Sequence, residues 1–415
     1  MPSSPPHPAS YAQRIAFVAE MAARLHRYGT TAQRLEAAIT ALSQRLDLEC
    51  EAWSNPTGLI LSFSDPTRSP GSVDVTRVVR LPPGENDLHK LSEADRIADA
   101  VAAGNLTIGQ GHTALRTLDR EPSGRAQVMQ VLAFGLAAAG VAGLWRLPWL
   151  DMATAAFTGL LIGLLAQFTS HRPALKEAGD ALAGLIAGTV VTMVAVVVGP
   201  LNLNTVVIAS LVVLLPGMSL TNAMNELSSQ HWVSGTVRFA GALTTVLKLT
   251  VGAMVAVILL DRLGLEPRVR AWRPQPEWVE WLSMGVAAFA FAVLFKASRR
   301  DYPWVMGAAI CGYLISRYAG NAWGSPAGIF LSAMALTAAG NGFGRWMQRP
   351  GAVVRLPGII MLVPGSASLR GLLTLIQQQD VGVGQSAMLT VLNIIMALVA
   401  GLLFGNLLIP ARKNL

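Results

Sequence analysis

The sequence predicts a polytopic α-helical membrane protein, with about ten transmembrane helices in two inverted five-helix repeats, preceded by a small cytoplasmic α+β domain. Three observations support this fold class. Only 13% of the 415 residues are charged and 52% are hydrophobic, with a mean hydropathy of +0.46, so polar groups are too few to cover a soluble protein. Apolar stretches long enough to cross a bilayer recur from residue 126 onward. Two of these stretches contain a Pro-Gly pair at the same place in each half.

Residues 1–125 hold much of the charge and form the expected cytoplasmic domain. The first ten residues lack the pattern of a signal peptide. Apolar residues then recur at helical spacing, and a break at Gly29 precedes a second helix with its N-cap at Thr30 or Thr31. The runs ECEAWSN, GLILSFSD and TRVVRLP predict strands, and a helical stretch over 86–119 closes the domain.

This domain has no recognisable catalytic or metal-binding motif. His26, His89 and His112 lie on separate elements without the spacing of metal ligands. The chain also lacks the motifs of nucleotide-binding loops, zinc proteases and serine hydrolases. We therefore expect no enzyme activity, no catalytic residues, no cofactor and no metal.

The membrane region divides at the Pro- and Arg-containing linker 261–278 into a first repeat, 126–260, and a second repeat, 279–415. We expect five spans in each repeat, interrupted where Pro-Gly occurs. The expected spans are 128–144, 153–168, 182–199, 205–227, 239–260, 279–295, 304–318, 327–343, 353–376 and 387–408.

Charge distribution orients the chain. Most loop Lys and Arg residues fall on the side of the N-terminal domain, which predicts that both termini are cytoplasmic. The net charge of +8 therefore reflects topology, because no basic block with interleaved aromatic residues indicates binding to nucleic acid. The expected partners are the lipid bilayer, protons and a small solute, and the chain could also form a homo-oligomer.

The Pro-Gly pairs predict where that solute binds. Pro216 and Pro364 are the expected hinges, because proline removes a backbone donor and breaks a helix into two halves. Interrupted helices in lipid line a cavity or are buried in protein. The half-helices that start after the hinges would direct free N–H groups at a carboxylate. The expected substrate-binding residues are Gly217, Ser219, Thr221, Asn222, Gly365, Ser366, Ser368 and Arg370.

Charged residues within spans are the second indication of a site, since they are costly in lipid and usually face a cavity. Arg370 could bind a substrate carboxylate, and Glu226 could bind an ammonium group or a coupling proton. Lys248 lies in the middle of its span. The alternative interpretation places Glu226 and Arg370 at the membrane interface and Lys248 in an internal ion pair. The asparagines at 225 and 341 and the GxxxG runs are more typical of helix packing.

The stretches LHRYGTTAQRLEAAI and TRVVRLPPGENDLHKLSEADRIADAV, together with the paired Pro-Gly segments, resemble the threonine/serine exporter family of bacterial membrane proteins. The resemblance covers nearly the whole chain. It implies proton-driven export (antiport) of threonine and serine across the bacterial cytoplasmic (inner) membrane. Some relatives divide the two halves between separate chains and are linked to succinate export.

Three other functions stay open at this point. The first is export of small dicarboxylates such as succinate, because both substrate classes contain a carboxylate. The second is a membrane-anchored enzyme, which would need a nucleophile and a base within reach of each other. The third is a sensor, for which ten spans with interrupted helices exceed what anchoring requires.

Overall fold

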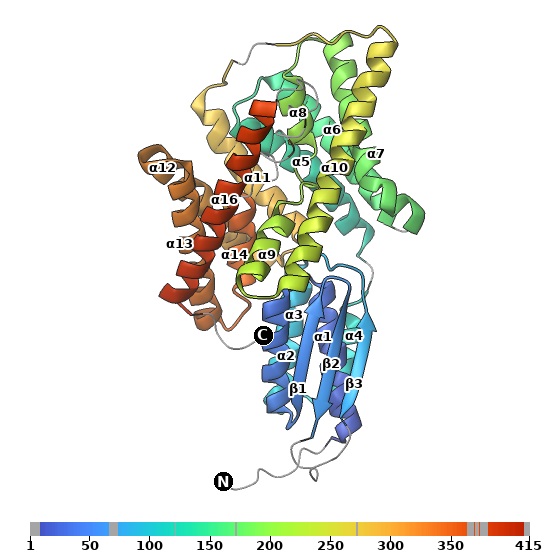
Figure 1. Cartoon of the computed structure of the whole chain (residues 1–415), viewed down its shortest axis with the longest axis vertical. Coiled ribbons are helices and arrows are strands. Elements are labelled where there is room, and N and C mark those ends of the chain that lie inside the picture. The colour runs from blue at the N-terminus through green and yellow to red at the C-terminus, as the bar shows by residue number, and fades with distance from the viewer. Residues whose placement is uncertain are drawn as a thin grey trace.

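The computed structural model describes residues 9–65, 74–120, 122–170, 172–270, 273–362, 369, 373 and 381–410. These residues form an N-terminal unit, with four helices and a three-stranded sheet, and a helical bundle beside it (Figure 1). The elements of the N-terminal unit are α1 (Tyr11–Arg27), α2 (Ala32–Arg45), β1 (Glu49–Asn55), β2 (Gly58–Ser64), β3 (Val75–Arg80), α3 (Leu88–Ala102) and α4 (Ile108–Thr117). Those of the bundle are α5 (Gly124–Leu144), α6 (Trp149–Ser170), α7 (Pro173–Val197), α8 (Leu203–Ser210), α9 (Gly217–Ser228), α10 (Trp232–Arg262), α11 (Glu277–Leu294), η1 (Arg299–Asp301), α12 (Tyr302–Trp323), α13 (Ser325–Met347), α14 (Ala352–Ile360) and α16 (Val381–Leu408).

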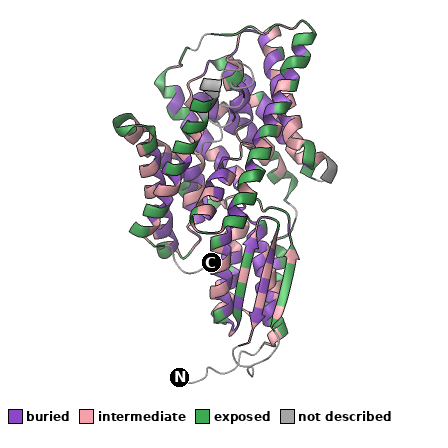
Figure 2. Cartoon of the chain, viewed as in Figure 1, coloured by how far each residue is buried: buried purple, intermediate pink, exposed green. Residues whose placement is uncertain are grey.

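The sheet of the N-terminal unit is antiparallel in the order β1-β2-β3, and its helices pack on one face (Figure 1). Leu59, Leu61 and Phe63 alternate along β2 and point into the core, where they join buried residues of α1 and α2 such as Phe17 and Leu35. This alternation is that of a strand buried on one face only. The third strand is largely exposed (Figure 2).

Helices and strands of this unit occur where the sequence predicted them. The break between α1 and α2 contains Gly29 at φ +83°, a left-handed conformation that glycine adopts without strain. Thr31 takes the N-cap position of α2, although its side chain makes no capping hydrogen bond. The helical stretch expected over 86–119 is divided into α3 and α4 by a turn at Gly104.

Among the described residues of the bundle, seven helices are long and apolar enough to cross a membrane: α5, α6, α7, α10, α11, α13 and α16. The chain is therefore a polytopic membrane protein. Of the other expected spans, α12 is long enough but less apolar, and the fourth is interrupted. The ninth begins as the nine-residue α14, and most of its remainder, from 363 to 380, lies outside the described residues.

The predicted interruption at the first Pro-Gly pair is confirmed. Helix α8 ends at Ser210, and α9 begins at Gly217, directly after Pro216. Proline cannot donate the backbone hydrogen bond that a continuous helix would need at this position. Two short helices therefore replace the single fourth span.

The bundle consists of two sets of elements with the same packing pattern. Helix α7 packs along α10, as α13 packs along α16, and α8 contacts α5, α6 and α7, as α14 contacts α11, α12 and α13. A buried aspartate begins the second helix of each set: Asp151 accepts hydrogen bonds from Asn202, just before α8, and Asp301 pairs with Arg349, just before α14. The same neighbours therefore meet in both halves.

Each set also contributes residues to the hydrophobic core of the other. Met218, at the start of α9, packs in the core of the second set, whereas Leu369 and Leu373, after the second Pro-Gly pair, pack in the core of the first.

Small residues allow the long helices to cross closely. A Cβ added at Gly252 of α10 would lie 2.0 Å from the Ala181 carbonyl oxygen of α7. The predicted packing role of the GxxxG runs is likewise confirmed, since Cβ atoms at their glycines would clash with neighbouring helices.

Candidate functional site

A cavity of about 740 Å³ lies where the N-terminal unit meets the bundle. This volume is in the range of sites for small molecules. We call it the interface cavity. It is lined by the end of α1 and the turn after it, by α2 and α3, and by α9, α13, α14 and α16. It therefore combines segments from both ends of the chain.

Hydroxyl and amide groups make up much of its polar lining. Helix α9, the half-helix after the first hinge, contributes Thr221, Asn222 and Asn225. The turn before α2 contributes Thr30 and Thr31. The Thr30 hydroxyl is buried and has no hydrogen-bond partner among the described residues.

Two arginines border this cavity, Arg34 from α2 and Arg355 from α14. Protein atoms enclose both guanidinium groups, yet both side chains keep accessible surface, because they border the cavity. Neither has an ion pair or hydrogen bond with any residue in the described parts of the chain. Burial lowers the pKa of Arg34 to about 10, and its charge is close enough to repel that of Arg355.

The other charged residues of the lining are already engaged. Arg349 makes a two-pronged ion pair with buried Asp301, with N–O distances of 2.5 and 3.2 Å. The cavity residue Asp95 of α3 also interacts with another group of the protein. The positive charges that remain unmatched are those of Arg34 and Arg355.

Glu226 lies outside the cavity lining, in the contact between α9 and the N-terminal unit. Its side chain is fully buried and accepts hydrogen bonds from Arg238 Nε at 2.9 Å and Nη2 at 3.1 Å. The same carboxylate accepts the backbone N–H of Ala32 at 3.0 Å, at the start of α2. Glu226 thus joins α2 to α9 and α10.

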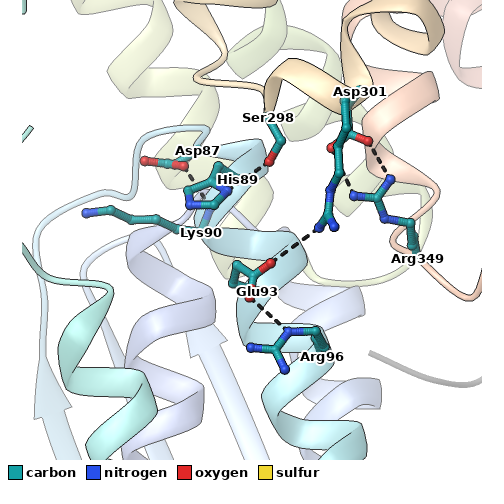
Figure 3. A network of polar contacts seen from close by, with 9 residues as sticks. Asp87, His89, Lys90, Glu93, Arg96, Ser298, Asp301 and Arg349 are labelled. Carbon is teal, nitrogen blue, oxygen red and sulfur yellow. Dashed lines mark hydrogen bonds and ion pairs between the residues drawn. The ribbon is translucent and has the colours of Figure 1, made fainter. Parts of the chain in front are cut away.

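A second set of contacts joins α3 to the turn after α11 (Figure 3). The backbone N–H of Leu88 donates to the Phe295 carbonyl at 3.0 Å, and that of His89 donates to the Lys296 carbonyl at 3.2 Å. The His89 ring also lies 2.8 Å from the Ser298 hydroxyl. Backbone hydrogen bonds across two units indicate a defined docked arrangement.

Further polar contacts join the two parts. Glu93 of α3 pairs with Arg300 at 3.3 Å, next to the Asp301–Arg349 pair shown in the same view (Figure 3). Glu36 of α2 lies 2.9 Å from the His231 ring before α10. The N-terminal unit is therefore attached to the bundle through both α2 and α3.

The remaining predicted site residues take different places. Gly217 and Ser219 are not part of the lining, although Gly217 accepts a hydrogen bond from the Thr221 hydroxyl at 3.1 Å. Lys248 donates to the Glu177 backbone carbonyl at 2.9 Å between α10 and α7, away from the cavity. The predicted site residues of the second Pro-Gly segment lie outside the described residues; they are Pro364, Gly365, Ser366, Ser368 and Arg370.

The sequence did not indicate a binding role for either of the two unpaired arginines of the cavity, Arg34 and Arg355. Arg355 lies near the start of the ninth expected span, where a charged residue can equally serve to orient the chain. Arg34 lies in the LHRYGTTAQRLEAAI stretch that supported the family resemblance, in which no residue was expected to bind the solute. The asparagine at 341 also lines the cavity, and its amide donates to Asn406 and to the Ile409 carbonyl, as expected for helix packing.

Comparison with known families accounts for most of the chain. Residues 16–260 match the ThrE family model of a threonine/serine exporter. Residues 280–408 match a second model, described as threonine/serine exporter, ThrE. The chain belongs to the threonine/serine exporter family. The resemblance inferred from the sequence is thereby confirmed.

Curated proteins similar to this chain come from yeasts. The Pheromone-regulated membrane protein 10 of Pichia sorbitophila is 25% identical over 388 residues, which cover 90% of this chain and 38% of the relative. The protein of the same name in Candida glabrata is 24% identical over 391 residues, covering 92% and 49%. An uncharacterized protein of Schizosaccharomyces pombe is 21% identical over 379 residues, covering 88% and 49%. The chain spans less than half the length of these relatives, and no solved structure matches it.

Proposed function

We propose that this protein is a secondary-active, proton-coupled exporter of threonine and serine in a bacterial cytoplasmic membrane. The interface cavity is the observation that supports this most directly. It combines hydroxyl and amide groups of the interrupted helix α9 with unpaired guanidinium groups, a composition that fits a small hydroxylated solute with a carboxylate. Family membership supports the choice of threonine and serine.

The proposal includes alternating access between two inverted five-helix halves with ten spans in total. The repeated packing pattern and the exchange of Met218 with Leu369 and Leu373 between the two cores favour it. In this arrangement the N-terminal unit and both termini are cytoplasmic, and the interface cavity is reached from that side.

Glu226 is our candidate for coupling to protons. A proton on its carboxylate would weaken the pair with Arg238 and the hydrogen bond to Ala32, two residues before Arg34 in the cavity wall. Proton uptake would thereby loosen α2 and alter the site. We expect Glu226→Gln to transport without dependence on the pH gradient; normal pH dependence in a folded variant would exclude Glu226 as the proton carrier.

Export of a dicarboxylate such as succinate is the second candidate, because two unmatched guanidinium groups, rather than one, border the cavity. The test is efflux from proteoliposomes loaded with labelled threonine, serine or succinate under an imposed pH gradient. Gradient-dependent loss of threonine and serine alone supports the first proposal. Loss of succinate alone supports the second, and no flux of any of the three overturns both.

A further inference from the structure

The interface cavity has a wall from each part of the molecule. We propose that Arg34 of α2 and Arg355 of α14 together bind the carboxylate of the solute, so that the binding site is complete only while the N-terminal unit is docked. This inference deepens the proposed function, on which it rests. It makes the N-terminal unit part of the substrate site and not a separate regulatory module.

The first support is electrostatic. Two enclosed guanidinium groups that repel each other and lack an acidic partner in the described chain are unfavourable in the empty protein. A carboxylate bound between them would offset the repulsion and supply the missing acidic partner. Guanidinium groups also match carboxylates geometrically, with two parallel N–H donors.

The second support is that the start of α2 is held firmly. The backbone N–H of Ala32 donates to Glu226, two residues before Arg34. Two residues after it, Glu36 contacts His231 and accepts the Ser54 backbone N–H at 2.8 Å. Arg34 is thus presented to the cavity by a helix anchored on both sides of it, as pre-organised binding requires.

The third support is the turn before α2. Gly29 is in a left-handed conformation, and a Cβ there would lie 2.5 Å from Asn86, so the turn is fixed in a shape that suits glycine. Thr30 follows it and borders the same cavity as Arg34. Its hydroxyl group is buried and has no hydrogen-bond partner among the described residues. This hydroxyl can accept a hydrogen bond from an ammonium or hydroxyl group, or donate one to a carboxylate.

The test measures binding to the purified full-length chain by titration calorimetry. The probes are threonine, serine and succinate, with threoninol, which lacks the carboxylate, as the matched negative probe. We expect the wild-type chain to bind at least one carboxylate and not threoninol. Tight binding of threoninol, or no binding of any carboxylate, overturns the proposal.

Variants then assign the site. Arg34→Gln and Arg355→Gln should each weaken carboxylate binding by about 10- to 100-fold, the usual loss for a charge-assisted hydrogen bond. Arg45→Gln is the matched control, because Arg45 lies on the same helix, pairs with Asp99 and does not border the cavity. It should bind as the wild type does.

Folding must be separated from binding. Because Arg34 has no described partner, Arg34→Gln should melt no lower than the wild type while losing the stabilisation that ligand adds. A lower melting temperature without ligand, together with unchanged affinity, would make Arg34 structural and overturn the proposal.

A transport assay distinguishes failure of the proposed function from failure of the proposed binding site. If the wild-type chain binds a carboxylate through Arg34 but moves no probe across a membrane, the proposed function fails and the site stands. If the chain exports threonine and Arg34→Gln does so with unchanged KM, the site fails and the proposed function stands.

Discussion

Two kinds of buried charge lie at the contact between the N-terminal unit and the bundle. Glu226 with Arg238 and Asp301 with Arg349 form closely matched ion pairs that join separate segments. Arg34 and Arg355 are surrounded by protein atoms but keep accessible surface in the cavity, and they have no such partner in the described chain. The difference indicates that the paired charges stabilise the bundle where it meets the N-terminal unit, whereas the unpaired charges await a ligand.

The physical reason is the cost of removing charge from water. A buried ion pair recovers much of this cost through its partner, and losing one partner leaves the other uncompensated. An enclosed charge without a partner is costly, and a ligand of opposite charge would reduce that cost. Substitutions in the two classes should therefore affect stability in opposite directions.

The largest expected effect is on Glu226, whose side chain is fully buried in its pair with Arg238. Glu226→Ala leaves Arg238 without its carboxylate and the Ala32 N–H without its acceptor, and we expect it to cost about 3 kcal/mol. The measurement is the melting temperature of the purified chain. The double variant with Arg238→Gln should recover part of the loss; equal stability of wild type and single variant would show that the Glu226 carboxylate does not stabilise this contact.

The Asp301→Asn substitution removes the charged partner of Arg349, a third arginine that borders the cavity. It should cost about 2 kcal/mol, because Arg349 loses its charged partner, while carboxylate affinity stays equal or rises. Thermal melting and calorimetry on the same sample check both parts. Weaker carboxylate binding in a folded variant would contradict the distinction between the two classes.

Arg34→Gln should have the opposite sign. Removing an enclosed, unpaired charge is expected to leave stability unchanged or raise it by about 1 kcal/mol. The comparison is the melting temperature without ligand against that of Arg45→Gln. A clear loss of stability would place Arg34 among the structural charges.

The smallest effect concerns His26, which avoids a buried charge by staying neutral. Burial lowers its pKa from the usual 6.5, and the hydrogen bond to the Pro82 carbonyl only partly opposes this. Below pH 6.5 the unfolded chain therefore binds more protons at this site than the folded chain. Stability should be fully present above pH 6.5 and fall as the pH drops towards the folded-state pKa.

His26→Gln isolates this contribution. An amide can still donate to the Pro82 carbonyl but does not titrate, so the melting temperature of the variant should fall less steeply below pH 6.5. Identical pH profiles for wild type and variant would contradict the assignment.

Local sequence signals were enough to predict the elements of this protein. Gly29 separates two helices because its conformation is local, and Pro216 interrupts the fourth span because it lacks an N–H group. Hydropathy likewise indicated the apolar helices. These features depend on residues that are close together in the sequence.

The interface cavity could not be predicted in this way. It brings together Arg34, Asn222 and Arg355, which are far apart in the chain and meet only when the N-terminal unit packs on the bundle. Glu226 is recognisable from the sequence as an unusual charge, but its pairing with Arg238 is not. Charge pairing across units depends on tertiary packing, which no local pattern encodes.

The most direct test of the shared site is counterflow of labelled threonine and succinate in proteoliposomes with wild type, Arg34→Gln and Arg45→Gln reconstituted side by side. We predict exchange by the wild type and Arg45→Gln, and little or none by Arg34→Gln despite normal folding. Equal exchange by all three proteins would contradict the claim that the N-terminal unit binds the solute.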